Sequence, residues 1–212
     1  MRLTILLIAL SLVAACGKAS NSNSSRTTGN QNAEIKKGVA PVADSEVAVI
    51  EMETPAYGTI KMELYSNIAP KAVARFKELA KEGYYDGIAF HRINKTVIQA
   101  GDANTKANAP SSGAIQMKEG DSGKPNVPAE FSDVPYDTGI LGAARLGNDV
   151  NSANSQFFIM LKREPQFDQK YTVFGKVIEG MNNVMTISGV EPKDNERPIE
   201  PVRIKTIRIE PR

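Results

Sequence analysis

The sequence predicts a mainly β domain in which short strands close into a barrel capped by two α-helices. Hydrophobic residues make up 41% of the 212 residues, which is enough for a substantial core. Most apolar runs are short, rich in β-branched or aromatic residues, and bounded by Gly, Asn or Pro. Only two segments have helical character. A barrel suits many short strands because closure removes exposed strand edges.

The first two strands are predicted to form a hairpin. Order begins near Glu46 with the runs VAVIEMET and TIKMELY. In the second run apolar and charged residues alternate from Ile60 to Leu64, which is typical of a strand with one buried face. The residues between the two runs, Pro55 to Gly58, favour a turn. The hairpin therefore opens the predicted domain.

Two segments predict helices. In SNIAPKAVARFKELAKEG, Ser66 or Asn67 is placed to cap the N-terminus, Pro70 suits the first turn and Gly83 suits the end. The apolar residues of this segment share one helical face: Val73, Phe76, and Leu79 or Ala80. The second, shorter helix is predicted at GMNNVMTIS.

The later strands are predicted at GIAFHRI, TVIQAGD, GILGAA, SQFFIML, YTVFGKVI and VRIKTIRIE. The apolar residues of the last run change phase, and a bulge near Thr206 would reconcile its two halves. The long segment from Ala103 to Ala129 has little periodicity. Such a loop inside a compact domain is more often functional than idle.

The charge and the rare residues exclude several kinds of site. The net charge of +2 argues against a nucleic-acid groove. His91 is the one histidine and Cys16 the one cysteine, and neither has partners at the spacing of a metal site. We therefore expect no metal, no cofactor and no nucleic-acid partner, with a monomer as the default state.

The N-terminal residues predict export. Residues 1–15 carry one positive charge at Arg2, an apolar run, and small residues before Cys16, which is the layout of a secretory signal. LVAAC resembles the bacterial lipobox, in which the cysteine is lipidated and begins the mature chain. The alternative is an ordinary cleaved signal with an incidental cysteine. Residues 16–45 are poor in large apolar side chains and are predicted to form a lipidated, flexible tether; residues 46–212 form the domain.

Three motifs carry a resemblance to a known family. FHRI with the downstream VIQAGD, then NSQFFIML, then YTVFGKVIEGM together resemble the cyclophilin-type peptidyl-prolyl cis-trans isomerases. The resemblance runs from about Val47 to Ile209. It implies a closed, eight-stranded antiparallel barrel with a helix at each end and a peptide-binding groove on its outer surface. Proline-containing unfolded or extended polypeptides would be the partners.

The resemblance also implies the catalytic residues. Rotation about an X–Pro bond breaks no covalent bond, so it needs neither a nucleophile nor net proton transfer. Arg92 matches the family arginine whose N–H stabilises the lone pair on the twisted prolyl nitrogen. Gln99 matches the glutamine that binds the substrate backbone, and Phe158 matches an aromatic of the proline pocket. His91 is expected to be structural.

Further residues are expected to bind the substrate by the same matching: Thr96, Val97, Ala144, Arg145, Gln156, Phe167 and Tyr171. One departure from the family pattern concerns RINKTVIQ, which is one residue shorter than usual. Thr96 and Val97 then stand where a phenylalanine and a methionine are common. The resemblance therefore implies a shallower proline pocket.

The predicted function is a lipid-anchored isomerase that accelerates X–Pro isomerisation in exported proteins. The alternative is a chaperone or adhesin module that binds proline-containing peptides without turnover. The predicted location is the bacterial cell envelope. If there are two membranes, the outer membrane facing the periplasm is favoured, because Gly17 and Lys18 lack an acidic retention signal.

Overall fold

The structure is a computed structural model that describes residues 33–107, 122–191 and 196–212, and it is mainly β. The strands are β1 (Ile35–Lys36), β2 (Glu46–Met52), β3 (Thr59–Leu64), β4 (Ala89–Phe90), β5 (Arg92–Ile93), β6 (Val97–Ala100), β7 (Phe131–Ser132), β8 (Ile140–Ala143), β9 (Phe157–Met160), β10 (Val173–Glu179) and β11 (Val202–Pro211). The helices are α1 (Pro70–Lys81) and α2 (Met181–Ser188). Short 3₁₀ turns are η1 (Pro55–Tyr57), η2 (Ala103–Thr105) and η3 (Pro165–Phe167).

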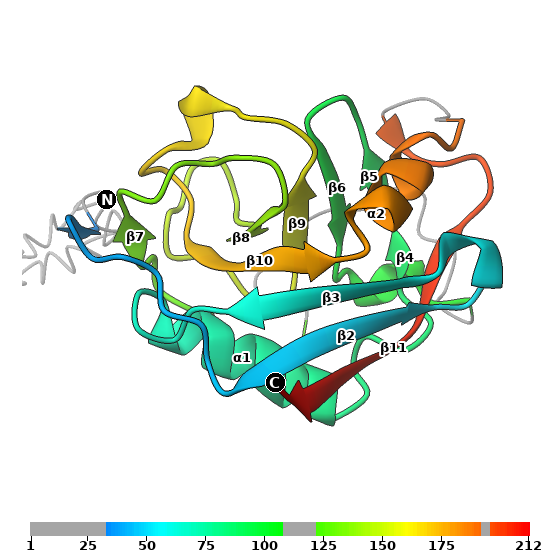
Figure 1. Cartoon of the computed structure of the whole chain (residues 1–212), viewed down its shortest axis with the longest axis horizontal. Coiled ribbons are helices and arrows are strands. Elements are labelled where there is room, and N and C mark those ends of the chain that lie inside the picture. Colours follow the sequence, from blue (N-terminus) through cyan, green and yellow to red (C-terminus); the bar gives the residue numbers. More distant parts are fainter. Residues whose placement is uncertain (1–32, 108–121, 192–195) are drawn as a thin grey trace, which may run out of the picture.

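One antiparallel sheet closes on itself. Its nine strands lie in the order β4-β11-β2-β3-β10-β8-β9-β6-β5. The first and last of these strands, β4 and β5, belong to one extended segment and are separated only by His91. The N–H of His91 also donates to the carbonyl oxygen of Gln99 at 3.0 Å, so the hydrogen bonding to β6 continues through it. Counted as one strand, β4 and β5 complete the predicted eight-stranded barrel (Figure 1).

The predicted hairpin and bulge are confirmed. Strands β2 and β3 pair antiparallel, with η1 and Gly58 between them. The predicted alternation places Ile60 and Leu64 inside the barrel, both fully buried. In β11 the register against β2 shifts between Ile204 and Thr206, where the change of phase placed the bulge.

Helix α1 closes one side of the core and buries the predicted face (Figure 1). The ring of Phe76 lies 5.4 Å from those of Tyr85, Phe157 and Phe174. The predicted cap is wrong. The residue before the helix is Ala69, and the N–H groups of Lys71 and Ala72 donate instead to the carboxylate of Glu130, at 3.0 and 2.9 Å. A carboxylate from a distant loop satisfies these helix N-terminal donors as a local cap would.

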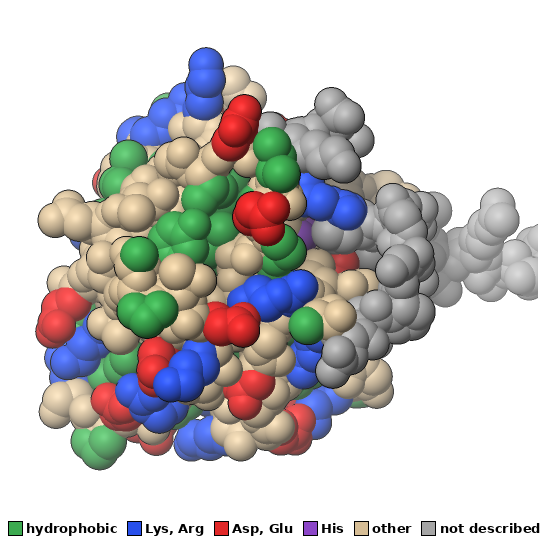
Figure 2. Space-filling model, turned by 90° about the vertical axis from the view of Figure 1, so that its right-hand side faces the viewer, with side chains coloured by type: hydrophobic (Ala, Val, Ile, Leu, Met, Phe, Trp, Pro, Cys, Tyr) green, Lys and Arg blue, Asp and Glu red, His purple; other side chains and the backbone are tan. Residues whose placement is uncertain are grey.

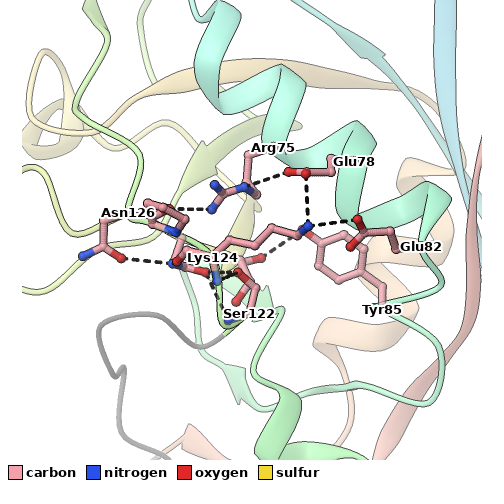
Figure 3. Close-up of polar contacts among 10 residues, drawn as sticks. Arg75, Glu78, Glu82, Tyr85, Ser122, Lys124 and Asn126 are labelled. Carbon is pink, nitrogen blue, oxygen red and sulfur yellow. Dashed lines mark hydrogen bonds and ion pairs between the residues drawn. The ribbon is translucent and has the colours of Figure 1, made fainter.

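Polar contacts tie the chain around Lys124 and Pro125, which leads to β7, to the exposed side of α1 (Figure 3). The ammonium of Lys124 lies 3.0 Å from the carboxylate of Glu78 and 2.9 Å from that of Glu82. The guanidinium of Arg75 donates to the carbonyl oxygen of Pro125 at 2.8 Å. These contacts hold the chain on its way toward β7 and β8.

The predicted flexible tether needs correction from residue 35 onward. Strand β1 pairs in parallel with β7, and the ammonium of Lys36 donates to the carbonyl oxygen of Ile68 at 2.7 Å. The carboxylate of Asp44 accepts hydrogen bonds from Ser66 and, at 2.6 Å, from Lys77. We call residues 34–45 the N-terminal strap. Its polar side chains and backbone find partners on the barrel, which composition alone does not reveal.

The predicted signal, Cys16 and the first half of the tether lie outside the described residues. In the ranges that the structure describes, no helix is long and apolar enough to cross a bilayer. The face that carries α2 shows hydrophobic side chains among interspersed acidic and basic ones (Figure 2). Met185 of α2 is among the exposed hydrophobic residues.

The strap should contribute measurably to stability. A truncated protein beginning at Ser45 loses the Asp44 and Lys36 contacts, whereas one beginning at Ala33 keeps them. Because a few such hydrogen bonds contribute about 2 kcal/mol in sum, we expect the shorter protein to melt roughly 4–8 °C lower. Calorimetry of both proteins checks this, and Asp44→Ala in the longer protein should reproduce part of the loss. Equal melting temperatures for the two lengths would contradict the docking of the strap.

Candidate active site

A row of residues crosses four neighbouring strands on one face of the sheet. Arg92 of β5 is opposite Gln99 of β6, Gln99 is opposite Phe158 of β9, and Phe158 is opposite Gly142 of β8. Directly opposed residues of antiparallel strands project to the same side of a sheet. The sheet therefore brings together the three residues predicted to be catalytic.

Phe158 is the centre of an aromatic cluster. Its ring lies 5.9 Å from that of Tyr136 and 5.7 Å from those of Phe167 and Tyr171. Phe158 and Tyr136 are buried, whereas Phe167 and Tyr171 are partly exposed. The neighbouring Phe157 faces the opposite way and packs in the core, as alternation along a strand predicts. Sequence reasoning missed Tyr136, because nothing near it in the chain marks it as part of the site.

Gly142 makes room for this cluster. A Cβ atom at this position would lie 2.2 Å from Cζ of Phe158 and within 3 Å of two further ring atoms. The ring of Phe158 therefore lies against the backbone of β8, where no larger residue fits. The run GILGAA thus contains a site residue whose contribution is the absence of a side chain.

Two glutamines form a polar patch beside the aromatic cluster. The side-chain nitrogen of Gln99 donates to Oε1 of Gln156 at 2.9 Å, and both residues are buried. The backbone of Gln156 in turn accepts from the N–H of Ala144 at 2.9 Å, directly after β8. The structure therefore joins three of the predicted residues in one hydrogen-bonded line.

Arg145 is held by its neighbours. Its guanidinium carbon lies 4.6 Å from the ring centre of Tyr171, a favourable cation–π distance. The same group donates to the carbonyl oxygens of Lys170 at 3.0 Å and Leu146 at 2.8 Å. Arg145 therefore fixes Tyr171 at the edge of the aromatic cluster.

The shortened hairpin between β5 and β6 is closed by one side chain. Oδ1 of Asn94 accepts from the N–H groups of Thr96 and Val97, both at 2.8 Å. The carbonyl oxygen of Thr96 accepts from the N–H of Leu161 at 2.8 Å, which ties the turn to the end of β9. Thr96 is partly exposed, whereas Val97 is buried opposite Met160. Asn94 thus explains how a loop one residue shorter than the family pattern still forms a tight turn.

Arg92 is half exposed and is paired with an acidic residue that the sequence did not single out. Its Nε donates to Oε2 of Glu196 at 2.5 Å, and Oε1 of the same carboxylate accepts from Asn94 at 3.0 Å. Burial raises the pKa of Glu196, but the hydrogen bonds from Arg92 and Asn94 outweigh it and hold that pKa below its usual value. The carboxylate is therefore ionised at neutral pH beside the predicted catalytic arginine.

The arrangement suits noncovalent chemistry. It offers an accessible cation, an amide pair and an aromatic wall within one face of the sheet. Within the described ranges, no group of three or more His, Cys, Asp or Glu residues is placed to hold a metal ion. Such a site can bind a peptide and stabilise a change in its charge distribution.

Comparisons with known proteins point to one family. A model of the family described as "Cyclophilin type peptidyl-prolyl cis-trans isomerase/CLD" matches residues 49–209. A "Probable peptidyl-prolyl cis-trans isomerase" of Brucella suis biovar 1 (strain 1330) is 41% identical over 154 residues, covering 72% of this chain and 78% of that protein. The peptidyl-prolyl cis-trans isomerase ppi1 of Schizosaccharomyces pombe is 38% identical over 159 residues, covering 74% of this chain and 96% of that protein.

A similar solved structure is a cyclophilin-type isomerase from Cryptosporidium parvum, crystallised in the presence of the dipeptide Ala-Pro. It has a TM-score of 0.64 and 29% sequence identity. The likeness covers 78% of this chain and 99% of that one.

His91 lies beside the site and is buried. It is 8% exposed, between the core residue Phe90 and the exposed Arg92. Burial lowers the pKa of His91 from 6.5 to about 4, although the nearby carboxylate of Asp102 acts in the opposite direction. The imidazole is therefore neutral at physiological pH, in keeping with its predicted structural role.

The buried neutral His91 predicts a pH-dependent stability. In the unfolded chain the imidazole binds a proton below pH 6.5, whereas in the folded chain it does so only below about 4. The stabilisation is therefore complete above pH 6.5 and is lost as the pH falls from 6.5 toward 4. We expect the free energy of unfolding to be about 2 kcal/mol lower at pH 5 than at pH 7.5.

Urea unfolding across this pH range measures the effect, and His91→Gln serves as the control. Because His91 is the one histidine of the chain, the variant should show a much flatter dependence between pH 7.5 and 5. Equal slopes for the wild type and the variant would show that His91 is not the group responsible.

Proposed function

Because the chain belongs to the cyclophilin-type peptidyl-prolyl cis-trans isomerases, we propose that it accelerates X–Pro rotation through Arg92 and acts on exported proteins as they fold. The observation that carries the mechanism is the row formed by Arg92, Gln99 and Phe158 on one face of the sheet. Such a row can hold an extended peptide with its prolyl ring, its backbone and its reacting nitrogen each beside a different side chain.

The chemistry requires a well-placed hydrogen-bond donor but no reactive group. Resonance in the X–Pro amide gives a rotation barrier of about 18–20 kcal/mol. As the bond twists, the prolyl nitrogen loses conjugation and gains a lone pair. An N–H of the Arg92 guanidinium directed at this nitrogen stabilises the twisted state more than the planar state, which lowers the barrier.

The magnitudes require help from the rest of the site. An acceleration on the order of a hundred-thousandfold corresponds to about 7 kcal/mol. A hydrogen bond to a charged group contributes about 1.5–3 kcal/mol. The remainder must come from holding the peptide in place and from the water-poor aromatic wall. In this proposal the partly exposed Phe167 and Tyr171 contact the prolyl ring, and the Gln99–Gln156 pair binds the peptide backbone.

The alternative is a module that binds proline-containing peptides without turnover. The shortened hairpin favours it, because Thr96 is small and Val97 is buried where the family pattern has larger residues at the pocket. The retained row of Arg92, Gln99 and Phe158 favours the isomerase.

The proposed location rests on residues 1–16. The apolar run and LVAAC support export and lipidation at Cys16, after which the mature domain would act on chains arriving unfolded in the cell envelope. Uncatalysed prolyl isomerisation takes tens of seconds, so a tethered isomerase would shorten a slow step in their folding.

Replacement of Arg92 tests the proposed mechanism. Loss of one charge-assisted hydrogen bond to the twisted amide should slow catalysed exchange roughly 10- to 150-fold in Arg92→Ala. Exchange spectroscopy of an Ala-Pro peptide with the domain measures the rate, and chemical-shift titration measures binding. Arg208→Ala is the matched control, since both arginine side chains are 47% exposed and both are ion-paired. If the wild type binds the peptide but leaves exchange at its uncatalysed rate, the binding module is the better description.

Lipidation is tested in cells that carry the full chain. We expect the wild type to incorporate a labelled fatty acid and to sediment with membranes, because acylated chains anchor the protein. Cys16→Ser should lose the label and leave the membrane fraction. An unlabelled, soluble wild-type protein would identify the N-terminal residues as an ordinary cleaved signal.

A further inference from the structure

The carboxylate of Glu196 joins two parts of the site. Glu196 precedes β11, and its carboxylate binds Nε of Arg92 of β5 at 2.5 Å. Its second oxygen accepts from the side chain of Asn94 at 3.0 Å. Since Asn94 also closes the turn before Thr96 and Val97, one carboxylate restrains both the arginine and the hairpin beside it.

The contact with Glu196 leaves the two terminal nitrogens of the Arg92 guanidinium accessible. Glu196 occupies the Nε side of the guanidinium, and in the described part of the chain the two terminal nitrogens have no hydrogen-bond partner. Arg92 stands on a two-residue strand with its side chain 47% exposed. A long side chain so placed has several rotamers, and fixing it costs conformational entropy. A carboxylate on Nε reduces that freedom before a substrate arrives.

The backbone of Glu196 indicates that its side chain is needed there. Its φ of 64° lies in the left-handed region, which only one other described non-glycine residue, Gln169, adopts. Glycine enters this region without the steric penalty that a Cβ brings. The ion pair itself is half exposed, at 47% and 42% for its two side chains, so it adds little to folding stability. Neither the backbone nor the folding energy therefore explains a glutamate at this position.

We propose that Glu196 is a positioning residue for the isomerisation, holding the guanidinium of Arg92 so that its terminal N–H groups face the prolyl nitrogen. This inference rests on the proposed function of Arg92. Orientation matters here because the benefit of a donor depends on its alignment with a lone pair that exists only near the transition state. Partial neutralisation of the arginine works against catalysis, but the carboxylate is half exposed, so solvent and salt screen its charge, and it binds Nε rather than the terminal nitrogens.

The test compares four proteins with the wild type. Glu196→Ala removes the carboxylate, Glu196→Gln keeps an acceptor without the charge, and Glu196→Gly removes the side chain and relieves the left-handed backbone. Glu210→Ala is the matched control: the side chains of Glu210 and Glu196 are both 42% exposed, and each pairs with an arginine Nε, that of Arg208 at 2.9 Å. Exchange spectroscopy and titration with an Ala-Pro peptide separate the on-enzyme exchange rate from affinity.

We expect Glu196→Ala and Glu196→Gly to slow on-enzyme exchange about 5- to 20-fold with affinity changed less than about twofold. Glu196→Gln should fall between them and the wild type. Glu196→Gly should melt no lower than Glu196→Ala, since glycine relieves the backbone. The Arg92 Nε–H resonance should be slowly exchanging in the wild type and in Glu210→Ala, and should broaden in Glu196→Ala.

Unchanged or faster exchange in Glu196→Ala, with Arg92→Ala still impaired, would overturn the positioning role and leave the proposed function standing. Faster exchange in particular would mean that Glu196 covers the arginine rather than orienting it. If the wild type itself does not catalyse exchange, the proposed function and this inference both fail. A broad Arg92 Nε–H resonance already present in the wild type would overturn the inference without reference to activity.

Discussion

Closure of the barrel through residues 89–93 is the constraint on which the site depends. The segment pairs with β11 on one side and β6 on the other, so it joins the two ends of the sheet. The strand is interrupted at His91, so the regular alternation does not run through it: Phe90 fills the core, His91 is buried as a neutral imidazole, and Arg92 projects from the surface. The same hydrogen bonds that close the barrel therefore fix the position at which the arginine emerges.

The aromatic cluster depends on a second close approach, between β8 and the ring of Phe158. Gly142 has no side chain to block this approach, and Tyr136, Phe167 and Tyr171 surround the ring. The buried members anchor the cluster in the core, whereas the partly exposed ones form its outer edge. A wall built in this way is rigid because it continues the packing of the interior.

Local sequence patterns predicted most of the fold. Alternation gave the buried face of β3, apolar spacing gave the inner face of α1, and the phase change in VRIKTIRIE located the bulge of β11. Each of these patterns is set by neighbours a few residues apart. The residues of the site row were implied by the family resemblance that FHRI, VIQAGD and NSQFFIML carry, and the structure places these motifs on adjacent strands.

The contacts that could not be predicted from the sequence join residues far apart in the chain. Glu130 caps α1 from 58 residues away, Lys77 binds Asp44 over 33 residues, and Glu196 reaches Arg92 over 104. Nothing in the local sequence indicates which distant residue a charged side chain will contact. For this reason the composition of the N-terminal strap predicted a flexible tether. These partners become apparent only when the topology brings distant loops together.

Stability and function are separated in this molecule. The core of the barrel is closed by apolar and aromatic packing, while the arginine, its carboxylate partner and the hairpin turn stand at the surface. Exposed ion pairs contribute at most about 1 kcal/mol to folding, so the surface network can change without unfolding the barrel. In the proposed mechanism the surface network contributes instead by restricting the orientation of the Arg92 guanidinium. Rotation about an amide bond requires an aligned hydrogen-bond donor rather than a reactive group. In this proposal the fold therefore serves catalysis by fixing the orientation of that donor.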